Sequence, residues 1–100
     1  MRVRIRSRNG GRRGLSKDQI ALIVDFVKWS AARLMPTIHK NVEIDLILDS
    51  KLFTKTKTYG MAIWEDRHVR GRQFSIEVDV TFSFVSIVHT VAHEMVHVKQ

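Results

Sequence analysis

The chain has 100 residues, of which 44% are hydrophobic and 27% are charged, as is ordinary for one small globular domain. It contains no cysteine, which excludes a disulfide framework and a cysteine-ligated zinc site. No apolar run reaches the length of a membrane span, about 18 residues, and the N-terminus lacks the apolar segment of a secretory signal. We therefore expect a soluble, cytoplasmic protein that does not enter a membrane.

The net charge of +7 is concentrated at the N-terminus. Residues 1–14 hold six arginines and no acid, whereas residues 15–100 hold eleven basic and ten acidic residues, a balance of +1. The alternation of arginine with Val3 and Ile5 fits a short strand, and the composition equally fits a disordered basic arm. Such an arm suits the phosphates of a nucleic acid, and a solvated tail or edge strand without a partner would have the same composition. We divide the chain into a basic N-terminal arm, 1–14, and a domain, 15–100.

The first element of the domain is a helix with a clear start and end. Ser16 and Gln19 are spaced as a capping box, in which each side chain bonds the other residue's backbone. Apolar residues at three- and four-residue spacing follow, and Pro36 stops the helix near Met35. Leu22, Phe26 and Trp29 widen its apolar face, which suggests a helix that is covered on more than one side.

Three strands follow the helix. Alternating apolar residues predict strands at 42–48, 59–64 and 72–80, and we expect the last two to pair as an antiparallel hairpin. Gly60 indicates a bulge or a close approach of backbone in the second of these strands. Residues 49–58 are a polar, lysine-rich connection whose apolar members, Leu52 and Phe53, can turn inward. A last helix from about 83 to 100, with Thr81 or Ser83 as its N-cap, completes an α+β layout with two helices on one small sheet.

The last helix carries the chemistry. His93, Glu94 and His97 form the pattern H-E-x-x-H, and on a helix two histidines four positions apart can reach one metal ion. Both histidines fall on the polar side of the helix, and Glu94 lies near the edge of that side, where it could take the proton of a metal-activated water. His89 shares this side but lies eight residues from His97, about 12 Å along the helix, so one ion cannot bridge them. We interpret it as a wall of the site, or as solvated.

The run Ile76-Glu77-Val78-Asp79, followed by residues 90–100 with H-E-x-x-H, resembles the SprT-like zincin metallopeptidase domains, including those encoded by phages. The resemblance is sharp in the last eleven residues and covers residues 16–100 in layout. It implies a zincin-like α+β fold with an N-terminal helix, a three-stranded, mainly antiparallel sheet and a C-terminal H-E-x-x-H helix. It also implies that His93 and His97 bind Zn²⁺ and that Glu94 is the general base. For a phage protein the location would be the cytoplasm of the host cell.

The third zinc ligand of the family lies beyond this helix. Gln100 stands where the long metzincin pattern requires glycine, so we expect the helix to continue and the domain to be truncated after it. The alternatives are a third ligand from His68, His39 or a carboxylate, or a degenerate site. Glu77 and Asp79 are most simply solvated or paired with arginines, and a role in orienting His93 or His97 is the other reading of them.

The sequence therefore indicates two possible functions. The first is a zinc metallopeptidase, with a protein or peptide as its substrate. The second is a basic nucleic-acid-binding module with a degenerate or structural metal site, which depends on the arginines of residues 1–14.

Overall fold

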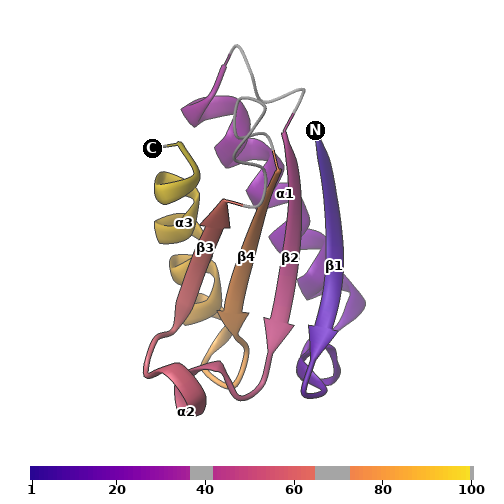
Figure 1. Ribbon diagram of the computed structural model, residues 1–100. Helices are drawn as coiled ribbons and strands as arrows, with labels where there is room; N and C mark the ends of the chain where they lie inside the picture. Colours follow the sequence, from indigo (N-terminus) through magenta and orange to yellow (C-terminus); the bar gives the residue numbers. More distant parts are fainter. Residues whose placement is uncertain (37–41, 65–72, 100) are drawn as a thin grey trace.

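The computed structural model describes residues 1–36, 42–64 and 73–99 (Figure 1). Its elements are, in chain order, β1 (Arg2–Arg8), the short 3-10 helix η1 (Gly11–Gly14), α1 (Lys17–Leu34), β2 (Glu43–Asp49), α2 (Leu52–Thr56), β3 (Gly60–Trp64), β4 (Gln73–Asp79) and α3 (Phe84–Lys99). The two long helices and the strands predicted at 42–48, 59–64 and 72–80 are confirmed to within a few residues. In the described parts of the chain no helix has the length and apolarity that a membrane crossing needs.

The sheet has four strands in the order β1-β2-β4-β3. β1 and β2 are parallel, with Arg2 opposite Glu43, and β2 and β4 are also parallel. Only β3 and β4 are antiparallel, with Met61 opposite Glu77, which confirms the predicted hairpin. The expectation of a three-stranded, mainly antiparallel sheet is wrong. Alternation shows which residues share a face but not which strand lies beside which, and here α1 carries the chain from β1 back to a parallel β2.

The start of α1 follows from its capping box. The Ser16 hydroxyl accepts a hydrogen bond from the Gln19 N–H at 3.1 Å, and the Ser16 N–H donates to the Gln19 side-chain oxygen at 2.9 Å. Both bonds satisfy N–H groups that the first turn of a helix leaves without partners. α1 ends at Leu34, with Met35 as its C-cap directly before Pro36, as predicted. Its outer face is less covered than predicted, because Leu22 and Trp29 are both 58% exposed.

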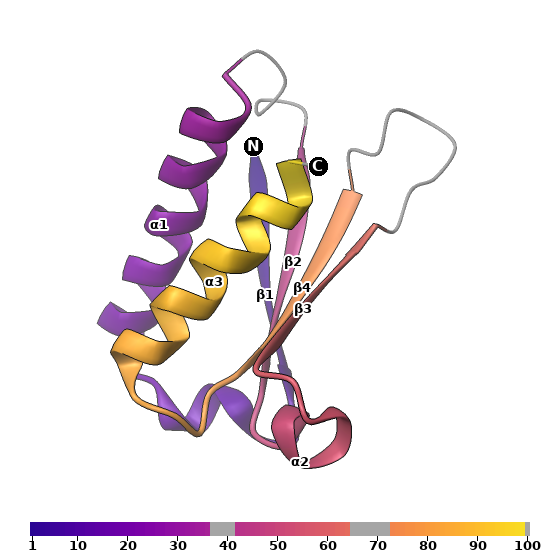
Figure 2. The same cartoon turned by 90° about the vertical axis from the view of Figure 1, so that its left-hand side faces the viewer.

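The molecule has two main layers (Figure 2). α1 and α3 pack side by side on one face of the sheet, and α2 lies on the opposite side, at the end where β2 and β4 finish. The core lies between the helices and the sheet, because the inward residues of both layers are apolar. It includes Ile23, Val27 and Ala31 of α1, Ile44, Leu46, Leu48, Ile76 and Val78 of the sheet, and Ile87, Val91 and Met95 of α3.

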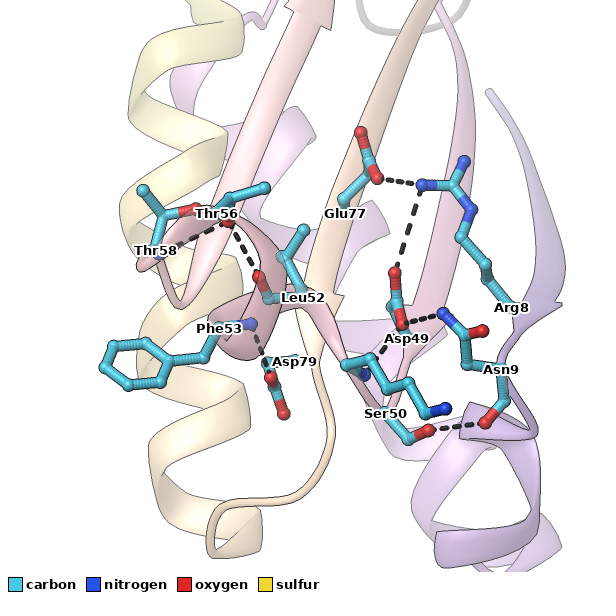
Figure 3. A network of polar contacts seen from close by, with 11 residues as sticks. Arg8, Asn9, Asp49, Ser50, Leu52, Phe53, Thr56, Thr58, Glu77 and Asp79 are labelled. Atoms are coloured by element: carbon cyan, nitrogen blue, oxygen red, sulfur yellow. Dashed lines mark hydrogen bonds and ion pairs between the residues drawn. The ribbon is translucent and has the colours of Figure 1, made fainter.

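On the other face of the sheet, ion pairs join arginines of β1 to carboxylates of β2 and β4. Arg4 donates to Asp45 of β2 at 2.8 and 3.3 Å. Arg8 reaches Asp49 of β2, 3.9 Å away, and donates to Glu77 of β4 (Figure 3). Of the two alternatives for the arginine-rich segment, the structure therefore has the strand, and Val3 and Ile5 pack against the core as that alternative expects.

Candidate metal centre

The candidate site lies on α3, whose helical form is decided by packing more than by propensity. Many of its residues are β-branched, which lowers intrinsic helix propensity. Four of its buried residues, Ile87, Val91, Met95 and Val98, are nevertheless apolar and belong to the core between the helices and the sheet. The hydroxyl of Ser83 accepts from the Ser86 N–H at 3.2 Å, so Ser83 is the N-cap, one of the two residues predicted for that role.

His93 and His97 lie one turn apart on the exposed side of α3, with their imidazoles together. Their Nε2 atoms are 3.2 Å apart and their ring centroids 4.8 Å apart. Two nitrogens that bind one tetrahedral zinc ion at 2.0–2.1 Å are themselves separated by about 3.3–3.4 Å. The observed separation of 3.2 Å, which is also that of a hydrogen bond between the two rings, is close to this value, so the two nitrogens could bind one ion.

Glu94 completes a group of three residues that could hold a metal ion. The ligand atoms of His93, Glu94 and His97 all lie within 4.8 Å of one another. The histidines are exposed, whereas Glu94 is only 6% exposed. Within the described ranges no other histidine, aspartate or glutamate joins this group.

Glu94 is buried because α3 packs very closely on β3 at Gly60. A Cβ atom on Gly60 would stand 2.5 Å from Cγ2 of Thr90 and 3.3 Å from Cγ of Glu94. Glycine is thus required for this contact, and the close approach predicted at Gly60 is confirmed. On the helix alone Glu94 lies near the edge of the polar side, and it is β3 that turns this position into a partly enclosed one.

An open pocket of about 410 Å³ adjoins the group, between α3 and the segment that leads into β3. Its walls include His93, Glu94, His89 and Tyr59. His89 lines this pocket and is also exposed, which fits both interpretations of it, and it stands outside the metal-binding group. The sequence did not single out Tyr59, because a tyrosine next to a strand has no signal that distinguishes a site residue from a surface one.

Two other candidates are placed away from the site. Glu77 does not orient the histidines. Its carboxylate accepts a hydrogen bond from Arg8 on the face of the sheet opposite α3. Asp79 accepts from the N–H groups of Phe53 and Thr81, both at 2.8 Å, and from the Thr81 hydroxyl. The orienting role considered for these two carboxylates is thus replaced by structural ones. His39 and His68 lie outside the described residues.

The hydrogen bonds of Asp79 change its acidity. Burial acts to raise the pKa of this carboxyl, but the bonds from the Thr81 hydroxyl and from the N–H groups of Phe53 and Thr81 outweigh it. The pKa of Asp79 is therefore held below its ordinary value of 3.8. The charged form is the one that anchors α2 and the start of the loop before α3.

No family model, curated protein or solved structure matches this chain. Fold and site together define a small α+β protein with a mixed four-stranded sheet and a His-Glu-His group that could hold a metal ion.

Proposed function

We propose that the chain is a zinc-dependent metallopeptidase domain of the SprT-like zincin type, in which His93 and His97 bind Zn²⁺ and Glu94 is the general base. The observation that carries the proposal is the 3.2 Å separation of the two Nε2 atoms beside the buried carboxylate of Glu94. A purely structural polar surface has no need for two imidazoles in contact or for a carboxylate pressed against a strand.

The donor set favours zinc over the hard cations. Imidazole nitrogen suits zinc and other late transition metals, whereas calcium and magnesium prefer oxygen ligands. Catalytic zinc sites normally have three protein ligands and keep one position open. His39, His68 and a carboxylate stay candidates for the third ligand, Glu94 among the carboxylates if it does not act as the base.

In the proposed reaction, zinc supplies Lewis acidity, which lowers the pKa of water and polarises the peptide carbonyl. Glu94 accepts a proton as the water oxygen bonds to the carbonyl carbon, and returns that proton to the nitrogen as the C–N bond breaks. The Glu94 side chain is buried, and its carboxylate lies within 4.8 Å of the ligand nitrogens of both histidines. His89 and Tyr59 wall the space in which the peptide would lie.

Metal binding is tested by isothermal titration of the full chain with zinc. His97→Ala should weaken zinc affinity by more than the about 10–100-fold that loss of an outer hydrogen-bonding partner costs. His89→Ala is the matched control, since His89 is on the same helix and pocket wall but outside the group, and its zinc affinity should equal that of the wild type. Equal affinities for all three proteins would remove His97 from the site.

Hydrolysis is tested with Glu94→Gln, which keeps the size and the hydrogen-bonding atoms of the side chain but cannot accept the proton. This variant should bind zinc and lose about 10²–10⁴-fold in the rate of peptide cleavage. Cleavage at the wild-type rate would exclude Glu94 as the base.

The alternative function, nucleic-acid binding, depends on the six arginines of residues 1–14, four of which lie in β1. Arg4, Arg6 and Arg8 form ion pairs with Asp45, Asp49 or Glu77, and a guanidinium that binds a phosphate would have to give up such a pair. This arrangement favours the peptidase proposal. A salt titration of DNA binding decides between them, because binding driven by phosphate contacts weakens steeply with salt. Substitutions are needed in place of deletion of residues 1–14, since deletion would remove β1 from the sheet.

A further inference from the structure

Two open pockets adjoin each other along α3, from the candidate metal centre toward the start of the helix, and we call them together the trough. The pocket beside His93 and Glu94 shares Tyr59, His89 and Thr90 with a second open pocket of about 360 Å³. The second pocket extends to Phe82 and Val85. The metal group thus lies at one end of the trough, and apolar side chains lie at the other.

The rings of Tyr59 and Phe82 line the far end of the trough, and the ring of Phe53 packs against both of them. Phe53 of α2, Tyr59 before β3 and Phe82 before α3 contact one another, with centroid separations of 4.8 Å for Phe53–Tyr59, 5.7 Å for Phe53–Phe82 and 4.8 Å for Tyr59–Phe82. The rings still face the trough, because Tyr59 is 51% and Phe82 38% exposed, and Val85 beside them is 77% exposed. Such rings offer a further aromatic ring both flat and edge-on contacts.

The Asp79 carboxylate holds the backbone next to this ring cluster by hydrogen bonds. It accepts from the N–H of Phe53 and from the N–H of Thr81, the residue before Phe82. Figure 3 shows the Phe53 N–H directed at Asp79 while the ring points away from the polar network. One buried carboxylate thus holds the backbone at Phe53 and at Thr81, next to Phe82, which limits the backbone ordering that binding at these rings would require.

We infer that the ring cluster Phe53–Tyr59–Phe82 binds a large apolar or aromatic side chain of the peptide substrate. Val85 lies eight residues before His93, about 12 Å along the helix, and an extended peptide covers about 3.3–3.6 Å per residue. The bound side chain would therefore stand about three or four residues from the bond that is cleaved. This inference rests on the proposed peptidase function and adds to it the substrate feature that the trough selects.

The test measures peptide binding apart from cleavage. Fluorescein-labelled peptides that differ only in one phenylalanine or serine are titrated into the full chain carrying Glu94→Gln, with fluorescence anisotropy as the readout. The phenylalanine peptide should bind at least about fivefold more tightly. Added Phe82→Ala or Val85→Asp should abolish that preference, and the high exposure of Val85 keeps the second variant folded. Trp29→Ala, an exposed aromatic of α1 that does not line the trough, should leave the preference intact.

The outcomes separate this inference from the proposed function. If the wild type cleaves peptides but the Phe82→Ala and Val85→Asp variants still prefer the phenylalanine peptide, the trough inference is overturned and the peptidase proposal stands. Selective, ring-dependent binding without any zinc-dependent cleavage would retain the trough as a peptide site and overturn the peptidase proposal. Displacement of the peptide by a single-stranded oligonucleotide would assign the rings to base stacking and overturn the inference.

Discussion

Gly60 and Thr90 approach so closely that a Cβ atom on Gly60 would lie 2.5 Å from Cγ2 of Thr90. We predict that Gly60→Ala forces α3 away from β3 and lowers the free energy of unfolding by about 1–3 kcal/mol, as overpacking does elsewhere. The same Cβ atom would lie 3.1 Å from the carbonyl oxygen of Glu77 and 3.3 Å from Cγ of Glu94, so the variant should also displace Glu94 and cleave peptides more slowly. Urea denaturation and a cleavage assay measure the two effects.

The matched control for this change is Gly14→Ala. A Cβ atom on Gly14 would meet only the carbonyl oxygen of Val80, at 4.0 Å, which is ordinary contact. The control should keep the wild-type stability to within about 0.5 kcal/mol. If Gly60→Ala were as stable and as active as the control, the close packing of α3 on β3 would not be what positions Glu94.

We predict that substitutions of Arg8 and Arg6 lower the free energy of unfolding by different amounts, although both residues lie on the same face of β1. Arg8→Ala removes the ion-pair partner of two buried carboxylates, Asp49 and Glu77, and should lower the free energy of unfolding by about 1–3 kcal/mol. Arg6→Ala removes a 3.7 Å contact to Asp45, which Arg4 still pairs, and should cost less than about 0.5 kcal/mol. Chemical denaturation of both variants gives the comparison. Equal losses would show that the pairing across the sheet carries no special stability.

The lowered pKa of Asp79 leads us to predict that the stability of the fold depends on pH. Its pKa is lower in the folded chain than the ordinary 3.8, so its contribution is complete above that value and is lost as the pH falls through the lower, folded pKa. Asp79→Asn should therefore cost about 1–3 kcal/mol at neutral pH, and the difference from the wild type should shrink as the pH falls below 3.8. Unfolding free energies across this range check it, and a difference that stays constant with pH would contradict the hydrogen-bond cause.

Local signals in the sequence were sufficient for the elements but not for their arrangement. The capping box of Ser16 and the stop at Pro36 bounded α1, because both act within a few residues of backbone. The parallel pairing of β1 with β2 had no such signal, since arginines alternating with apolar residues suit a strand and a solvated arm alike. The acids that favour the strand, Asp45, Asp49 and Glu77, lie far away in the chain.

For the candidate site too, local features could be predicted from the sequence and long-range ones could not. His93 and His97 could be placed together from helical spacing alone, because both lie on one helix. The burial of Glu94 could not, since it depends on the packing of α3 against β3. The ring cluster could not either, since it depends on α2, the segment before β3 and the loop before α3 meeting at one end of the sheet. The short α2 itself was missed, because five residues are too few for a helical periodicity.

The pairing of β1 with β2 has a consequence for how the chain folds. Arg4 and its partner Asp45 are 41 residues apart, so β1 leaves the ribosome before β2 does, and closing so long a segment has an entropic cost. Until then β1 is an unpaired strand with apolar Val3 and Ile5, the kind of segment that aggregates. We expect its four arginines to keep the nascent strand soluble by mutual repulsion, as charged residues do on exposed strand edges.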